Sequence, residues 1–210
     1  MFLADEFFLT AHRYPSGAPL LSGRVTGLGV SAALLAELVL HGVITLHGGT
    51  LAVLTTTPPP EPLARCLQRR LVADPGEHSA RDWLSYLAGS GVIEAVGDRL
   101  ARAGHVRAER RRRLLRRAAV AYVPADIRTA LGAGARVHGN LTAGIRLTVP
   151  DVLLGGLIVA TGLDRHVLWD LRPGDRDHLC QRIAHLAGPL RELVAEAEAA
   201  VGEAVLSHRT

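Results

Sequence analysis

The fold is decided by residues 27–47, which read GLGVSAALLAELVLHGVITLH. Apolar residues recur at helical spacing through the first two thirds of this stretch and fill the neighbouring positions too, so we expect a helix buried on nearly all sides. Gly42 can adopt the left-handed conformation that closes a helix, and the β-branched residues 43–45 after it favour an extended backbone. Because glycines at 48–49 allow a tight reversal into residues 50–54, the sequence predicts a central helix, a glycine and a hairpin.

Composition indicates an ordinary folded protein. The chain has 210 residues, 48% of them hydrophobic, which is enough to bury a sizeable core without cross-links. The 24 residues counted as Lys+Arg are all arginine, as a GC-rich coding bias produces, so the net charge of +4 indicates an anionic partner only weakly. Cys66 and Cys180 lie far apart without a CxxC or a His/Cys ladder, which predicts a reducing, cytoplasmic compartment and neither disulfides nor a zinc site.

We expect no segment that crosses a membrane. A spanning helix needs about 18–20 apolar residues, and the longest apolar stretches are interrupted by Glu37 or by Asp151. Residues 1–9 place an acidic pair where a signal peptide would have basic residues. A membrane contact of this chain is therefore expected to be made from the surface.

The rest of the chain is mostly helical in pattern. Helices are expected at residues 2–11, 63–74, 79–89, 92–103, 147–171 and 175–208. Residues 55–62 contain consecutive prolines and predict an extended connector, whereas three glycines between 132 and 139 predict a loop. The order helix, glycine, apolar strand recurs near Gly104. The fold class is therefore mainly α: one compact helical domain over residues 1–210 with short β-hairpins.

Seven arginines gather in residues 107–117 and form the strongest polar feature of the chain. They are Arg107, Arg110, Arg111, Arg112, Arg113, Arg116 and Arg117, with Leu114 and Leu115 in their midst. The run can be a basic hairpin or a basic helix, and it can be no more than a solvated face. The functional alternative is an anion-binding surface for phospholipid headgroups or for nucleic-acid phosphates. The leucine pair favours phospholipid, because a peripheral membrane contact combines basic residues with an apolar tip.

No catalytic constellation is visible. Residues 27–32 fit the GxGxxA spelling of a dinucleotide site, yet no βαβ unit or acidic partner follows, and only the helix N-terminus with Ser31 could hold a phosphate group. The histidines form no HExxH motif, and Ser90 misses the GxSxG pattern. We interpret Glu37 as a carboxylate satisfied by an arginine or a backbone amide. No enzyme activity, metal or cofactor is therefore expected.

Four segments, taken in order, resemble the Golgi phosphoprotein 3 family in its bacterial branch. Residues 3–9 are similar to the family's opening Leu-x-Glu-Glu-hydrophobic motif, and residues 27–44 are similar to its central signature. Residues 82–84 and 99–106 resemble later family segments. The resemblance spans most of the chain and implies a mostly helical domain with a protruding β-hairpin at about residues 106–123, without enzyme activity.

The same resemblance implies binding to phosphatidylinositol 4-phosphate on membranes. The eukaryotic headgroup pocket uses a tryptophan before the central helix, an arginine within it and two arginines on a later helix. The corresponding positions here hold Gly23, Ser31, Ser90 and Ile93. None of the four pocket residues is kept, and Arg24, next to the first position, is the candidate replacement.

We therefore expect a non-enzymatic, cytoplasmic protein that is peripheral on the inner face of the membrane and binds acidic phospholipid headgroups. Its expected anion-binding residues are Arg24, Ser31 and the seven arginines of the run, and Leu114 and Leu115 are its expected membrane-contacting pair. The hairpin is also a candidate for self-association.

Two alternatives remain from the sequence. A winged-helix nucleic-acid binder also combines helix, glycine and basic hairpin. Against it, residues 28–40 are apolar where base-reading side chains would be needed, and only Arg99 and Arg102 are suitably placed on the second candidate helix. The other alternative is a scaffold that positions a protein partner, for which the sequence offers no specific mark.

Overall fold

The computed structural model describes residues 1–74, 76, 78–113 and 116–207 of the chain. Its helices are α1 (Leu3–Thr10), α2 (Gly23–Leu40), α3 (Pro62–Ala73), α4 (Ala80–Gly89), α5 (Val92–Arg102), α6 (Ile127–Thr142), α7 (Val149–Ala160), α8 (Asp164–Val167), α9 (Pro173–Ala184) and α10 (Gly188–Ser207). Its strands pair as antiparallel hairpins: β1 (His12–Arg13) with β2 (Ala18–Pro19), β3 (Ile44–His47) with β4 (Thr50–Val53), and β5 (Val106–Arg113) with β6 (Arg116–Pro124). The mainly α fold class is confirmed.

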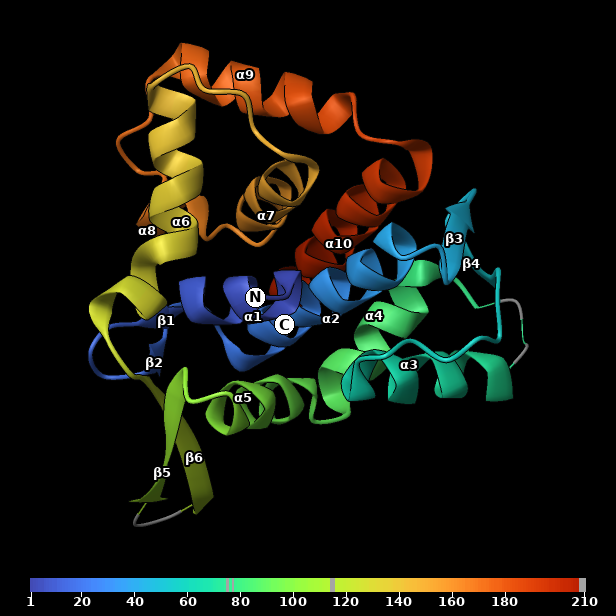
Figure 1. Ribbon diagram of the computed structural model, residues 1–210, viewed down its shortest axis with the longest axis horizontal. Helices are drawn as coiled ribbons and strands as arrows, with labels where there is room; N and C mark the ends of the chain where they lie inside the picture. Colours follow the sequence, from blue (N-terminus) through green and yellow to red (C-terminus); the bar gives the residue numbers. More distant parts are fainter. Residues whose placement is uncertain (75, 77, 114–115, 208–210) are drawn as a thin grey trace.

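Helix α2 lies at the centre of the molecule, and α1, α4, α5, α7 and α10 pack around it (Figure 1). Every residue from Val25 through Leu38 is buried. The helix has the length and mean hydropathy, 1.5, of a membrane-spanning segment, but 78% of it is buried inside the protein. Its apolar surface is therefore used in packing, which fits the prediction of a core helix.

Two glycines of α2, Gly27 and Gly29, permit close packing against α4 and α1. The helix begins at Gly23, where Ser22 Oγ accepts a hydrogen bond from the Val25 amide. A Cβ at Gly29 would lie 2.2 Å from Phe7 Cζ, and one at Gly27 would lie 3.0 Å from a backbone oxygen of α4. The helix thus begins one turn before the GxGxxA spelling of residues 27–32, at the Ser22 cap.

The predicted order of helix, glycine and hairpin occurs twice. Gly42 follows α2 with φ +65°, and Gly104 follows α5 with φ +77°. After each glycine the next amide donates back to a helical carbonyl, from Val43 to Leu38 and from His105 to Leu100, both at 2.9 Å. This is the left-handed cap that only glycine adopts readily. Each cap turns the chain out of its helix into a strand.

Three predictions of element boundaries are wrong. The expected loop at 132–139 lies inside α6, where Gly134 permits close packing because a Cβ there would lie 2.8 Å from Val167 Cγ1. The helix expected at 147–171 is divided into α7 and α8 by Gly162, whose φ is +72°. The helix expected at 175–208 is likewise divided, into α9 and α10.

Candidate functional site

The arginine run forms an antiparallel hairpin and not a helix. The register joins Val106 to Pro124 at the base and Arg113 to Arg116 near the far end. The 8 residues of β5 correspond to roughly 26 Å of strand. The hairpin projects from the body beyond α5 (Figure 1).

The base of the hairpin is fixed by Tyr122. This side chain is 5% exposed and lies against Gly97 of α5, where a Cβ would lie 2.5 Å from the ring. Its hydroxyl donates to Asp98 Oδ1 at 2.9 Å, and its ring meets Phe8 edge to face at 5.7 Å. Burial, followed by this hydrogen bond, raises the pKa of Tyr122 well above its usual value. The base is therefore held by α1 and α5 together.

Beyond this base the hairpin is charged. Arg107 and Arg110 are exposed, and neither makes a salt bridge within the part of the chain that the structure describes. Glu109 is the only acid in residues 106–124. Leu114 and Leu115 lie outside the described residues, as do the side chains of Arg111, Arg112, Arg113, Arg116 and Arg117.

The two other predicted anion-binding residues are on α2. Arg24 is exposed in the first turn of α2, and its Nη1 donates to the Ser85 carbonyl at 3.3 Å. Ser31 is 0% exposed and donates to the Gly27 carbonyl at 2.7 Å. The expectation that Ser31 holds an anion needs correction, because it lies in the third turn of α2 and not at the helix N-terminus.

A cleft of about 380 Å³ opens beside the N-terminus of α2, between the β1–β2 turn, α5 and β6. Gly23 and Ile93, two of the four positions that the resemblance places at the eukaryotic headgroup pocket, line it. The lining contains the Glu94 carboxylate and His12, whose pKa is lowered by burial, but no arginine. The described lining thus lacks the cations that a phosphorylated headgroup requires.

Glu37 belongs to a buried cluster of charges that joins several helices. Its Oε1 accepts a hydrogen bond from the Ala4 amide at 2.7 Å. Arg99, 7% exposed, binds Asp5 at 2.8 Å and also faces Glu61 at 3.5 Å and Glu37 at 3.9 Å. Burial raises the pKa of Glu37 to about 7, against the lowering effects of the Ala4 amide and Arg99. The Ala4 amide hydrogen-bonds this carboxylate and the Arg99 guanidinium lies near it, which fits the interpretation from the sequence.

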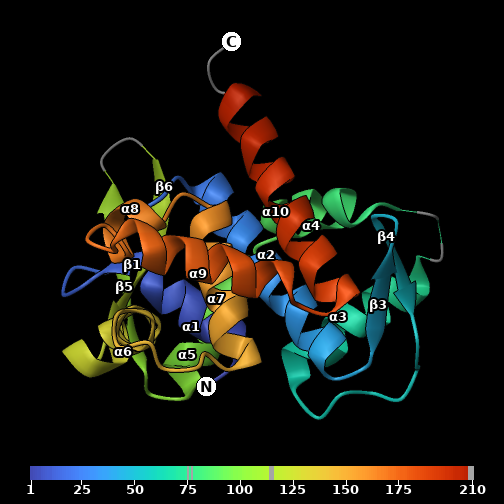
Figure 2. The ribbon, with the colours of Figure 1, turned by 90° about the horizontal axis from the view of Figure 1, so that it is seen from above.

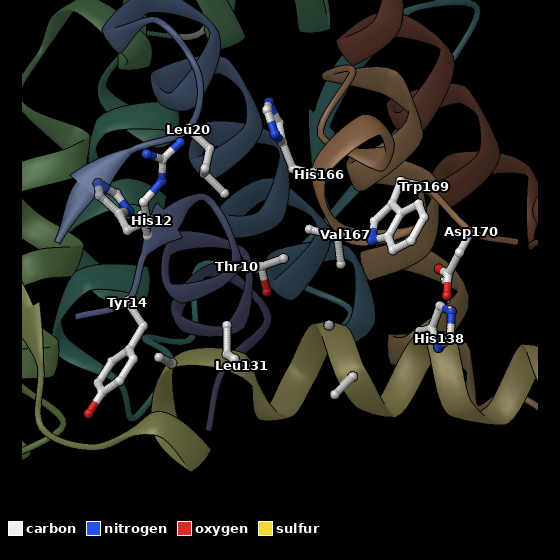
Figure 3. Close-up of a pocket in the computed structure, with 14 residues that line it drawn as sticks. Thr10, His12, Tyr14, Leu20, Leu131, His138, His166, Val167, Trp169 and Asp170 are labelled. Carbon is white, nitrogen blue, oxygen red and sulfur yellow. Dashed lines mark hydrogen bonds and ion pairs between the residues drawn. The ribbon is translucent and has the colours of Figure 1, made fainter. Parts of the chain in front are cut away.

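A larger cleft, of about 560 Å³, lies between the β1–β2 turn, α6 and α8 (Figure 3). The rings of Tyr14 and Trp169 stand on opposite sides of its opening, with Leu131 between them. At one side His138 Nε2 and Asp170 Oδ1 form a pair at 2.9 Å. The cleft thus combines exposed aromatic rings with one polar pair at its edge.

A family model for Golgi phosphoprotein 3 (GPP34) matches residues 3–205, nearly the whole chain. The chain belongs to the Golgi phosphoprotein 3 family. No individual curated protein matches it. The family predicted from the four motifs is therefore confirmed, and the fold just described is that of a family member.

Two residues at these sites, Tyr122 and Trp169, are not indicated by the sequence. Tyr122 anchors the hairpin, yet in the sequence it is one tyrosine in an apolar strand. Trp169 is 71% exposed at the rim of a cleft, which no local pattern predicts. Within the described residues, no group of three or more His, Cys, Asp or Glu side chains is arranged to hold a metal ion.

Proposed function

We propose that this family member is a non-enzymatic peripheral membrane protein whose hairpin β5–β6 binds acidic phospholipid headgroups on the cytoplasmic face of a membrane. The observation that carries the proposal is a strand pair bearing seven arginines and one acid, fixed at its base and extended away from the body. The hairpin is a two-stranded sheet, and the unpaired edge of such a sheet can pair with a second copy, so self-association is part of the proposal.

The electrostatic contribution can be estimated per residue. A basic side chain near an anionic membrane surface contributes about 1 kcal/mol. Arg107 and Arg110 are exposed and free of salt bridges within the described chain, so both are available for headgroups. Together they should contribute about 2 kcal/mol, which corresponds to about 30-fold in membrane partitioning.

The proposed ligand is acidic phospholipid in general and not one phosphoinositide. A headgroup-specific site needs several cations around one phosphate, whereas the cleft beside α2 offers Glu94 and a buried histidine. Arg24 is exposed nearby but already donates to the Ser85 carbonyl. Binding through the hairpin alone should therefore depend on salt and on total lipid charge.

The position of α2 argues against the nucleic-acid alternative. A recognition helix must reach base edges in a groove, whereas α2 is buried from Val25 through Leu38. On α5, Arg102 is exposed but Arg99 is buried beside Asp5. A shift of duplex DNA in a gel that persists above physiological salt would favour nucleic acid instead.

The test is co-sedimentation with vesicles of neutral lipid, of phosphatidylglycerol, and of neutral lipid with phosphatidylinositol 4-phosphate, each at low and physiological salt. We expect salt-sensitive binding to both acidic compositions and about 30-fold weaker partitioning for the double variant Arg107→Ala/Arg110→Ala. The quadruple variant of residues 110–113 to alanine should lose binding while retaining the helical circular dichroism of the wild type.

A matched control removes the same charge elsewhere. Arg69 and Arg146 are exposed on other parts of the surface. The double variant Arg69→Ala/Arg146→Ala should bind nearly as the wild type does. Equal weakening by both double variants would reduce the effect to net charge and would refute the hairpin assignment.

A further inference from the structure

Three apolar side chains stand exposed together near the larger cleft. Trp169 is 71% exposed and Leu131 49%, and both line the cleft; Ile127, one turn earlier on α6, is 57% exposed. Figure 3 shows the Trp169, Leu131 and Val167 side chains around this cleft. Exposed apolar groups that cluster in this way mark an interaction surface.

This cleft lies at the same end of the molecule as the hairpin. Figures 1 and 2 both place the β1–β2 turn, the start of α6, α8 and the hairpin at one end of the long axis, away from α3 and the β3–β4 hairpin. The β1–β2 turn joins the two features. Gly17 lies so close to the hairpin base that a Cβ would be 2.5 Å from the Tyr122 carbonyl oxygen, and Arg13 and Tyr14 of the same turn line the cleft.

At this end of the molecule, several arginines lack salt bridges whereas two carboxylates have partners. Arg13, Arg128 and Arg165 are exposed and make no salt bridge within the described chain. In contrast, Asp170 is paired with His138, and Asp164 with Arg176 at 3.1 Å. Arg13 and Arg165 are therefore available to an external anion, whereas Arg128 interacts with Asp126 and the Asp164 carboxylate is held by Arg176.

We infer that this end of the molecule is a second membrane-contact site, in which Trp169 and Leu131 enter the interfacial layer of an anionic bilayer and Arg13 meets a lipid phosphate. Tryptophan favours this layer because its ring is apolar and its N–H is polar. Free arginines beside exposed apolar side chains are the combination that holds a protein on an acidic lipid surface. The inference rests on the proposed membrane function and adds a contact independent of the hairpin.

The fluorescence of Trp169 tests the inference directly. The other tryptophan, Trp83, is 6% exposed and lies on α4, so subtracting the spectrum of Trp169→Phe isolates the Trp169 signal. On vesicles of phosphatidylglycerol, this signal should shift to shorter wavelength and be quenched by lipids brominated near the headgroup. An unchanged signal on bound protein overturns the inference and leaves the hairpin function intact.

Binding measurements give an independent readout. Trp169→Ser should weaken partitioning about tenfold, since it removes the burial of a large ring. The matched control is Leu54→Ser, because Leu54 is 60% exposed just after β4, at the other end of the molecule, and its loss should not weaken binding. Equal effects of the two variants overturn the inference.

Two further outcomes distinguish failure of the proposed membrane function from failure of the bilayer contact at this cleft. Absence of wild-type binding to acidic vesicles would overturn both the proposed function and this inference. A Trp169 shift with monomeric lysophosphatidylglycerol but not with bilayers would assign the cleft to a soluble lipid and overturn bilayer contact.

Discussion

Replacing Glu37 by glutamine should make the free energy of unfolding less dependent on pH. Burial raises the pKa of Glu37 from 4.5 to about 7, while the Ala4 amide and Arg99 act in the opposite direction. The folded state therefore holds this proton more tightly than the unfolded state does. The associated stability is fully present below pH 4.5 and is lost as the pH rises to about 7.

The size of the effect follows from the two pKa values. At about 1.4 kcal/mol for each pH unit, the full loss is about 3.4 kcal/mol. Roughly 2.5 kcal/mol of it falls between about pH 5 and about pH 8. In Glu37→Gln the side-chain oxygen can still accept the Ala4 amide, now 2.7 Å away, but there is no charge to bury. The variant should therefore gain stability relative to the wild type as the pH rises.

Urea unfolding followed by far-ultraviolet circular dichroism measures both proteins at each pH. Other titrating groups affect the two proteins alike, so the difference in their pH profiles isolates Glu37. Glu94→Gln is the matched control, because Glu94 is exposed on α5, and its profile should follow the wild type. Parallel profiles for the wild type and Glu37→Gln would refute the reasoning, since they would mean that the carboxyl carries its charge at no cost.

Two further substitutions test how the core and the hairpin base are held. Gly29→Ala should lower the free energy of unfolding by about 1–3 kcal/mol, because its Cβ would lie 2.2 Å from Phe7 Cζ. Gly23→Ala, with nothing within 4 Å, is the control in the same urea titration, and equal losses would contradict the packing argument. Tyr122→Phe should cost about 1–2 kcal/mol through loss of the hydrogen bond to Asp98. It should leave vesicle binding unchanged, and weaker binding would show that the hydroxyl does more than anchor the hairpin.

The sequence predicts those parts of the fold that are determined by neighbours along the chain. The periodicity of residues 27–40 is visible locally, and so is the left-handed glycine at Gly42. Gly134 was misread as a loop marker because its reason lies in Val167, which is far away in sequence. The start of α2 was placed too late because the cap at Ser22 lies outside the apolar run.

The same contrast between local and distant determinants applies to the candidate site. The arginine run was visible in the sequence, but its hairpin form was settled by pairing between β5 and β6. The sequence predicts an anion-binding role for Ser31, but Ser31 is buried because other helices pack over α2, which no local pattern shows. The exposure of Trp169 likewise depends on where α6 and α8 come together.

Residues 27–44, which resemble the central signature of the family, are mostly packing residues in this structure, so their presence carries information about the fold and little about lipid. Within residues 27–44, Gly29 admits the ring of Phe7, Glu37 accepts the Ala4 amide, and Gly42 turns the chain at φ +65°. A chain can keep all three and still present any side chains at the N-terminus of α2. Membership therefore carries the fold to this protein, whereas membrane binding has to be established at the hairpin and at the surface around Trp169, where the solvent-exposed charges and rings lie.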